Sequence, residues 1–193
     1  MSDYTLVVVT NDRTTVRTAG TVGPRGPAGT SADVADGPLA AARTLDARLA
    51  TNLAAVSSAN QTRYVRMRGN HPAATGLWIC VGASSGNISV GVVPNNGSSG
   101  LAARPSGARK ATSGPVACPA AGAFTFVPFL AAIDIVDGDW FALSADNITA
   151  TFGRATSVAP GGAGVAYQEN AHPVPANVGA VTASTSVYFA ASR

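Results

Sequence analysis

Short runs of apolar or alternating residues, separated by turn-forming clusters, fill the chain from residue 61 to residue 193. Clusters of Gly, Pro, Asn, Asp and Ser lie between the runs, and no helical period passes through the region. Such a series predicts a mainly β fold, with a β-sandwich or jelly roll over 61–193. About 130 residues are enough for a core of their own. The seven predicted strands are Tyr64–Arg68, Leu77–Val81, Ile88–Val93, Phe124–Leu130, Trp140–Ser144, Ile148–Phe152 and Ser186–Ala190.

Residues 1–19 have the pattern of a β-hairpin. The β-branched run Tyr4–Thr10 is stopped by Asn11-Asp12, and a second run, Thr14–Thr18, follows at once. Two such runs on either side of a turn signal predict paired antiparallel strands. Because a two-stranded hairpin is only marginally stable in water, we expect these strands to join a sheet contributed by other chains.

Glycine occupies every third position four times running within residues 20–31. Proline stands directly after glycine in two of these triplets. A collagen triple helix needs this period because only glycine fits at its crowded axis. Four triplets are too few to hold a triple helix alone, so a Gly/Pro linker remains an alternative to a collagen-like neck in a trimer. The glycines of the predicted neck are Gly20, Gly23, Gly26 and Gly29.

Residues 36–59 predict an α-helix. Asp36 can cap its N-terminus, and Pro38 is tolerated in the first turn, where its missing N–H costs nothing. Apolar residues recur at steps of three and four and form one narrow stripe. After a Gly-X-Y run we interpret this helix as a second trimerising segment, although an amphipathic helix packed on its own domain gives the same pattern. The trimer contacts would include Leu45, Leu49, Leu53 and Val56.

Charge is sparse in this chain. Charged residues make up 12% and hydrophobic residues 46%, with a net charge of +3. Such a composition excludes a solvated disordered tail. The arginines are scattered without a basic helix, so we predict no nucleic-acid partner, and no apolar run reaches the ~18 residues of a membrane span. The densest arginine group, Arg63–Arg68, alternates with apolar residues and predicts a strand with one solvent-facing side.

The residues give little support to catalysis or metal binding. Cys80 and Cys118 lack CxxC or CxxH spacing, and a disulfide between them stays open. His71 and His172 each precede a proline in a loop-like setting, and the sequence has no G-x-S-x-G motif. Asp137-Gly138-Asp139 could offer oxygen ligands to Ca²⁺, but a β-turn explains it more simply. We therefore predict no enzyme, no catalytic residue, no metal and no cofactor.

Three segments of the predicted β region resemble bacteriophage tail and fibre proteins. Ser85–Val92 resembles the "SGNI-x-VGI" strand of that family, and Gly114–Gly122 continues the match. Ile135–Phe152 resembles the family pattern "L-T-P-G-x-Y-W-L-A-L-S-x-D-N-T-T-A-T-F". The resemblance covers 61–193. It departs at Asp137-Gly138-Asp139, where the family has Pro-Gly, and over Gly161–Val178.

This resemblance implies a structural component of a bacteriophage virion, made in the host cytoplasm. The chain would be a homotrimeric fibre or spike on the tail or the head, attached to other virion proteins through residues 1–19. Its outer domain, 61–193, would contact host-surface carbohydrate. The alternative is a capsid decoration, cement or head-fibre protein that binds no receptor. A cellular carbohydrate-binding module is a third class, and we would expect that class to be monomeric.

Binding by such a domain would rest on its loops. Loop residues with aromatic or amide groups can stack on a sugar or form hydrogen bonds with it. Trp78 and Trp140 lie within strand runs and are predicted to belong to the core. The candidate receptor-binding residues are Asn95, Asn96, Tyr167, Gln168, Asn170 and His172.

Overall fold

A computed structural model describes residues 5–10, 13–18, 42, 44, 52–122, 124–155, 164–184 and 186–193. The chain divides into two units, Met1–Asp33 and Val34–Arg193. In the first unit, strand β1 (Thr5–Thr10) pairs antiparallel with β2 (Arg13–Thr18). Thr10 lies opposite Arg13, which confirms the predicted hairpin. The predicted neck at 20–31, with Gly20, Gly23, Gly26 and Gly29, lies outside the described residues.

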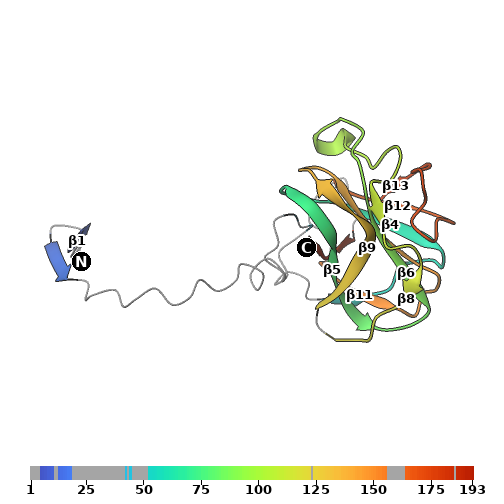
Figure 1. Ribbon diagram of the computed structural model, residues 1–193, viewed down its shortest axis with the longest axis horizontal. Coiled ribbons are helices and arrows are strands. Elements are labelled where there is room, and N and C mark those ends of the chain that lie inside the picture. The colour runs from blue at the N-terminus through green and yellow to red at the C-terminus, as the bar shows by residue number, and fades with distance from the viewer. Residues whose placement is uncertain are drawn as a thin grey trace. The chain divides into compact units, whose positions relative to one another are not determined.

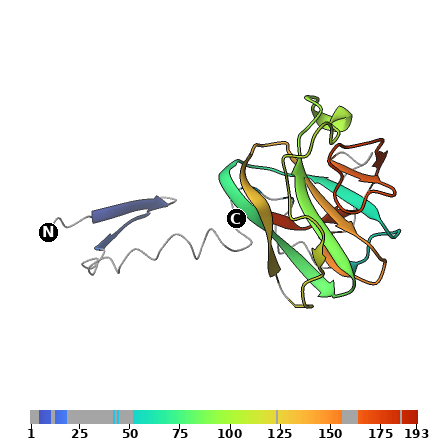
Figure 2. The ribbon, with the colours of Figure 1, turned by 45° about the vertical axis from the view of Figure 1, so that its right-hand side comes forward.

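The second unit is mainly β and contains two antiparallel sheets (Figures 1 and 2). The first sheet has the order β13 (Thr182–Ala183), β12 (Val165–Gln168), β4 (Gln61–Arg66), β10 (Trp140–Ala145), β6 (Asn87–Val93), β7 (Ala111–Thr112), and β8 (Val116–Ala117) also pairs with β6. The second has the order β14 (Val187–Tyr188), β11 (Thr151–Ala155), β5 (His71–Ala83), β15 (Ala190–Ser192). Strand β3 (Asn52–Ala54) pairs with β11, and β9 (Phe124–Ile135) pairs with β5. Within the described residues the single helix is a short 3-10 turn, η2 (Gly100–Ala102).

The two sheets share one hydrophobic core. Phe141 and Leu143 of the first sheet belong to the same buried cluster as Leu77, Ile79 and Phe152 of the second. A smaller buried cluster lies on the other face of the first sheet and contains Tyr64, Trp140, Ala142, Ala166 and Val174. Every residue of β10 is buried as a result. The prediction that Trp140 belongs to the core is confirmed, since its side chain is fully buried.

The sequence predicts that one side of Arg63–Arg68 faces solvent, and this prediction is wrong for most of strand β4. Residues 61–65 are all buried. Arg63 donates hydrogen bonds to the hydroxyls of Ser184 (2.9 Å) and Ser57, and its guanidinium lies 5.0 Å from the centre of the Tyr167 ring. Ser57, Ser184 and the ring of Tyr167 therefore cover a side that alternation alone marks as exposed.

The predicted helix does not extend to residue 59. Asn52–Ala54 form β3, because the edge of β11 offers backbone partners, with Leu53 opposite Gly153. Leu53 is 57% exposed, whereas Val56 is buried in the core of its own chain. The remaining predicted contacts, Leu45 and Leu49, lie outside the described residues.

Two described residues inside 36–51 also have non-helical partners. The carbonyl oxygen of Ala42 accepts the N–H of Ser192 (2.7 Å), and the N–H of Thr44 donates to the carbonyl of Ala190 (2.9 Å). Their backbone groups thus bond to strand β15 and not to a helical turn. Trimerisation through residues 36–59 stays a prediction, with no contact from the described residues to support it.

The turn Asp137-Gly138-Asp139 is held by a buried ion pair. Asp139 is 3% exposed, and its Oδ2 accepts from Lys110 Nζ (2.7 Å) and from the N–H of Val136 (2.9 Å). Asp137 instead accepts from the N–H of Gly69 (2.9 Å). The two carboxylates therefore have separate partners within the fold.

Replacing Lys110, the sole lysine of the chain, tests this ion pair. We expect Lys110→Met to lower the free energy of unfolding by about 2–3 kcal/mol, because the buried carboxylate of Asp139 would lose its cation. The measurement is equilibrium unfolding in urea. Asp137→Asn is the matched control and should cost less than about 0.5 kcal/mol, since its pair with Arg68 is exposed and long (3.9 Å). Equal losses in the two variants would contradict the assigned role of Asp139.

Candidate functional site

A cleft of about 340 Å³ lies beside the end of β4. Its volume falls in the range of about 300–1,000 Å³ that small-molecule sites occupy. The lining comes from five parts of the second unit: the segment at Thr44, the end of β4 with the residues just after it, the loop with η2, the start of β12 and strand β14. The lining residues are Thr44, Val65, Arg66, Arg68, Ser99, Gly100, Gly164, Val165 and Val187.

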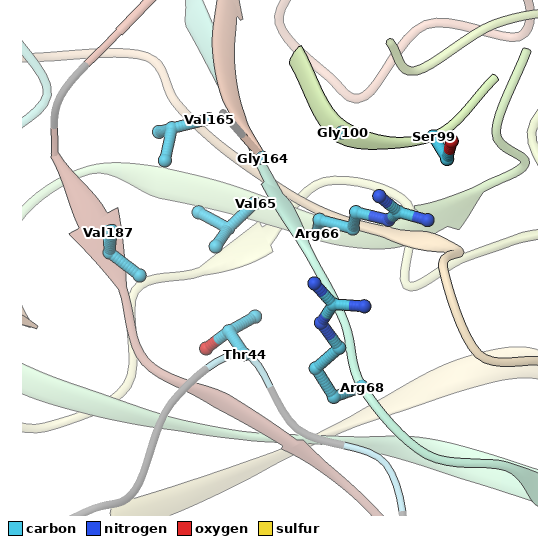
Figure 3. A pocket seen from close by; sticks show the side chains of 9 residues that line it. All are labelled: Thr44, Val65, Arg66, Arg68, Ser99, Gly100, Gly164, Val165 and Val187. Carbon is cyan, nitrogen blue, oxygen red and sulfur yellow. The ribbon is translucent and has the colours of Figure 1, made fainter. Parts of the chain in front are cut away.

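Two arginines and three valines give the cleft two different sides (Figure 3). Arg66 and Arg68 are two residues apart at the end of β4, and residues at this spacing in an extended chain face the same way. Figure 3 shows their guanidinium groups on the side of Ser99 and Gly100. Val65, Val165 and Val187 lie on the other side and are buried. The cleft can therefore offer two cations to a ligand, while its valines are at most 6% exposed.

Arg66 lacks a partner in the part of the chain that the structure describes. Its Nε is buried without a hydrogen bond, and no ion pair involves its guanidinium. Arg68 has one ion pair, from Nη1 to Asp137 Oδ2 (3.9 Å), and both of those side chains are more than half exposed. None of the described residues that line the cleft is acidic.

Two glycines make room for Arg66. Gly138 has a φ of +93°, and a Cβ atom there would lie 3.0 Å from Arg66 Nη2. Gly164 has a φ of +80°, and its Cβ would lie 3.3 Å from Arg66 Cβ. Side chains at either position would strain the backbone and crowd the arginine. Gly138 of the Asp137–Asp139 turn thus leaves room for the guanidinium of Arg66.

Asn95 and Asn96, predicted as receptor contacts, organise the loop that forms one wall of the cleft. Asn95 Oδ1 accepts from Trp140 Nε1 (3.2 Å), and its Nδ2 donates to the carbonyl of Ser98 (2.6 Å). Asn96 Oδ1 accepts the N–H groups of Ser98 (3.1 Å) and Arg104 (3.2 Å). These amides already have partners in the fold and shape the loop that presents Ser99.

The other four candidates lie at the far end of β4. Tyr167 pairs with Arg63 and Gln168 with Thr62, about 10–15 Å along the strand from Arg66. Gln168 Oε1 accepts from Tyr64 Oη (3.1 Å) and from the N–H of Gly179 (3.0 Å). The six predicted residues therefore do not form one site in the structure.

Asn170 and His172 follow β12 at this same end. Asn170 is exposed and has a φ of +50°. His172 Nδ1 lies 3.0 Å from Ser144 Oγ. Of the four, only Asn170 presents a fully exposed side chain to a ligand.

Both histidines contact a serine hydroxyl. His71 Nδ1 lies 2.7 Å from Ser192 Oγ, and His172 Nδ1 lies 3.0 Å from Ser144 Oγ. A serine beside a histidine can act as a nucleophile when a substrate reaches it. Both serines are fully buried, so neither hydroxyl faces a surface that a substrate could approach. That the protein is no enzyme stays a prediction.

Cys80 and Cys118 are free thiols. Burial raises the pKa of the Cys80 thiol above its ordinary value, which disfavours the reactive thiolate. No group of three or more His, Cys, Asp or Glu residues is placed to hold a metal within the described ranges. Among the same residues, no helix is long and apolar enough to cross a membrane.

Comparison with known proteins gives no family for this chain. It matches no protein-family model, no curated protein and no solved structure. The resemblance to bacteriophage fibre proteins therefore rests on the quoted segments and stays a prediction. Function has to be argued from the fold and the cleft.

Sequence reasoning missed Arg66, Arg68 and Ser99 as members of one site. A signal was present, because Arg63–Arg68 is the densest group of arginines in the chain. The pattern does not show which of these arginines receives partners from the fold. Arg63 is covered by loops, whereas Arg66 is not, and the difference depends on residues more than 100 positions away.

The burial of His172 predicts how the free energy of unfolding changes with pH. Burial lowers its pKa, and the nearby charge of Asp146 only partly opposes this effect. Below about pH 6.5 the unfolded chain binds this proton more readily than the folded chain. The free energy of unfolding should therefore fall as the pH drops from 7 to 5, and less steeply in His172→Gln.

Urea unfolding of both proteins at pH 7.5, 6.5 and 5.5 measures this difference. The comparison uses the slope of the free energy of unfolding against pH, so a loss of stability that the substitution causes equally at every pH does not affect it. Identical slopes in the two proteins would contradict the burial of His172 as a neutral group.

Proposed function

We propose that the chain is a structural component of a bacteriophage virion. It would form a homotrimeric fibre or spike, attached through residues 1–19, with its second unit as a β-sandwich knob that contacts host-surface glycans. The observation that carries the proposal is the division of the chain into a two-stranded hairpin and a separate, much larger β unit. An anchor and a binding domain require such a division.

The hairpin favours attachment by strand addition. Strands β1 and β2 form a sheet of two, and no other described strand pairs with either of them. Two strands cannot bury a core, and their outer edges offer unpaired backbone groups to another sheet. An edge strand on a virion protein would satisfy these groups.

The second unit has properties that suit a knob. Its two sheets share a core, which supports the β-sandwich interpretation. Rigid sheets can hold loops in fixed positions for binding. The cleft offers each subunit one small site, and three weak sites on a trimer gain affinity through multivalency.

A second candidate function is capsid cement. Several large apolar side chains are exposed, as in proteins that contact other proteins over a broad surface. The most exposed is Leu130 on β9, at 77%, and the others are Leu53, Leu101, Val136 and Ile148. In this alternative the second unit would bind neighbouring virion proteins and no glycan.

The oligomeric state of the full chain is a direct test of the trimer. Light scattering at micromolar concentration should give about 58 kDa, three times the 19.2 kDa of one chain. Replacing Gly23 and Gly26 by alanine should lower this mass if the Gly-X-Y segment winds three chains together. A mass of 19.2 kDa for the unaltered chain would contradict the fibre proposal.

Attachment and host contact can be tested separately. A chain lacking residues 1–19 should no longer be incorporated into particles, as immunogold labelling of purified virions would measure. Excess full chain should bind host cells and slow phage adsorption. Incorporation through the N-terminus without any effect on adsorption would favour cement and contradict the receptor-binding part of the proposal.

A further inference from the structure

The cleft holds an arginine whose charge and hydrogen-bond donors lack a described partner. A buried donor without an acceptor is unfavourable, and such atoms are usually satisfied by water or a bound group. Arg66 Nε is in this position, as are Nε of Arg63 and Arg154, but those two arginines donate hydrogen bonds from their Nη atoms, whereas no described residue accepts one from the guanidinium of Arg66. The neighbouring guanidinium of Arg68 has only a long, exposed ion pair with Asp137, which contributes little. Two cations thus line one cleft with almost no compensating negative charge.

Four other described arginines of the second unit have hydrogen-bond partners within the fold. Each donates a hydrogen bond from its guanidinium to a serine hydroxyl or to a backbone carbonyl. These bonds fix the side chains against strands and loops. Arg66 has no such bond, which separates it from the arginines that maintain the structure. The four arginines are Arg63, Arg104, Arg109 and Arg154.

Guanidinium groups favour ligands with paired oxygens. Their planar fork matches a carboxylate or phosphate with two parallel hydrogen bonds, and these charge-assisted bonds are stronger than neutral ones. Arg66 and Arg68 lie on the same side of the cleft (Figure 3). An oxyanion bound between them would use the free donors of Arg66 and offset the charge of both.

The rest of the lining bears on what carries the oxyanion. Val65, Val165 and Val187 line the other side of the cleft but are at most 6% exposed, so they add little apolar surface for a ligand to cover. Ser99 is exposed and lines the cleft on the side of Arg66. A sugar ring carries hydroxyl groups that can form hydrogen bonds with Ser99 and with the free guanidinium nitrogens. A nucleic-acid strand needs a row of cations for successive phosphates, and the cleft offers only two.

We propose that this cleft binds a saccharide through an acidic substituent, a carboxylate or a phosphate, held by Arg66 and Arg68. The saccharide part of this inference rests on the proposed function, because it takes the receptor to be a glycan. The preference for an anion rests on the cleft alone. The receptor would then be an acidic surface polysaccharide.

Calorimetric titration of the full chain with four probes tests the inference. The probes are a trigalacturonate, glucose 1-phosphate, a neutral galactose trisaccharide and inorganic phosphate. At least one acidic saccharide should bind more tightly than the neutral one. Arg66→Gln should weaken that binding about 10- to 100-fold, the loss expected for a charge-assisted hydrogen bond. The affinity of the Arg66→Lys variant should lie between those of the unaltered chain and of Arg66→Gln, because lysine keeps the positive charge but lacks the planar guanidinium fork.

Two further variants separate the cleft from general effects of charge and stability. Arg17→Gln removes the same charge from β2, in the other unit, and should leave binding unchanged. Ser99→Trp adds bulk at an exposed residue with extended backbone (φ −117°), and should weaken binding without any change in charge. Circular dichroism and thermal unfolding of each variant show whether the fold is retained.

Each contrary result overturns a defined part of the inference. Equal binding of acidic and neutral saccharides, or binding unaffected by Arg66→Gln and Ser99→Trp, would overturn the assignment of the cleft. Inorganic phosphate binding as tightly as glucose 1-phosphate would overturn the saccharide part. Tighter, Arg66-dependent binding of a single-stranded DNA oligonucleotide, titrated as an additional probe, would replace the glycan by a nucleic acid. The adsorption assay tests the proposed function independently, since a chain that binds neutral glycans would still slow adsorption.

Discussion

Strand β10 is paired along both edges and buried on both faces, and its register determines where the cleft forms. Trp140 lies opposite Arg66 of β4 and opposite Val93 of β6. The start of β10 therefore brings the end of β4 beside the loop that follows β6. The indole of Trp140 then holds that loop through Asn95. A shift of one residue would turn every side chain of β10 to the other face, and both buried clusters would be lost.

The other end of β10 shows the same dependence. Ser144 contacts His172 in the segment after β12, and Ala145 lies opposite Gln61 at the start of β4. Gln61 donates from Nε2 to Glu169 (2.7 Å), so polar groups join the loop to the sheet. These contacts fix the end of the sheet opposite the cleft. The fold thus places the contacts of Ser144 and Gln61 at one end of β10 and the unpartnered guanidinium of Arg66 at the other.

Much of the fold could be predicted because the long strands bury regular runs of apolar residues. All seven predicted runs overlap strands of the structure, including those that became β5, β9 and β10. Strands of two to four residues, such as β7 and β13, were not predicted, because their backbone partners determine them and no apolar pattern marks them. For the same reason Asn52–Ala54 was taken for helix: its alanine-rich context has helical propensity, but pairing with β11 prevails.

The candidate site was less predictable than the fold. Asn95 and Asn96 lie in a loop, as the sequence predicts, yet hydrogen bonding within that loop uses their amides. Sequence can suggest that an amide is suited to bind a sugar, but it cannot show whether the fold has already used the group. Arg66 is the opposite case, because the alternating pattern predicts only that it lies in a strand and gives it no role in binding. Its lack of a partner emerges only from the folded structure, in which no described residue accepts a hydrogen bond from its guanidinium.

The claim that Arg66 recognises an acidic saccharide can be tested most directly at its own nitrogen. In ¹⁵N-resolved NMR spectra of the full chain, the Nε–H signal of Arg66 can be followed during titration with trigalacturonate or glucose 1-phosphate. The account predicts a saturable shift of this signal with at least one acidic probe and none with the neutral galactose trisaccharide. It would be contradicted if the Arg66 signal stayed unchanged with both acidic probes, or moved no more than that of Arg109, whose guanidinium is bonded to the carbonyl of Val174.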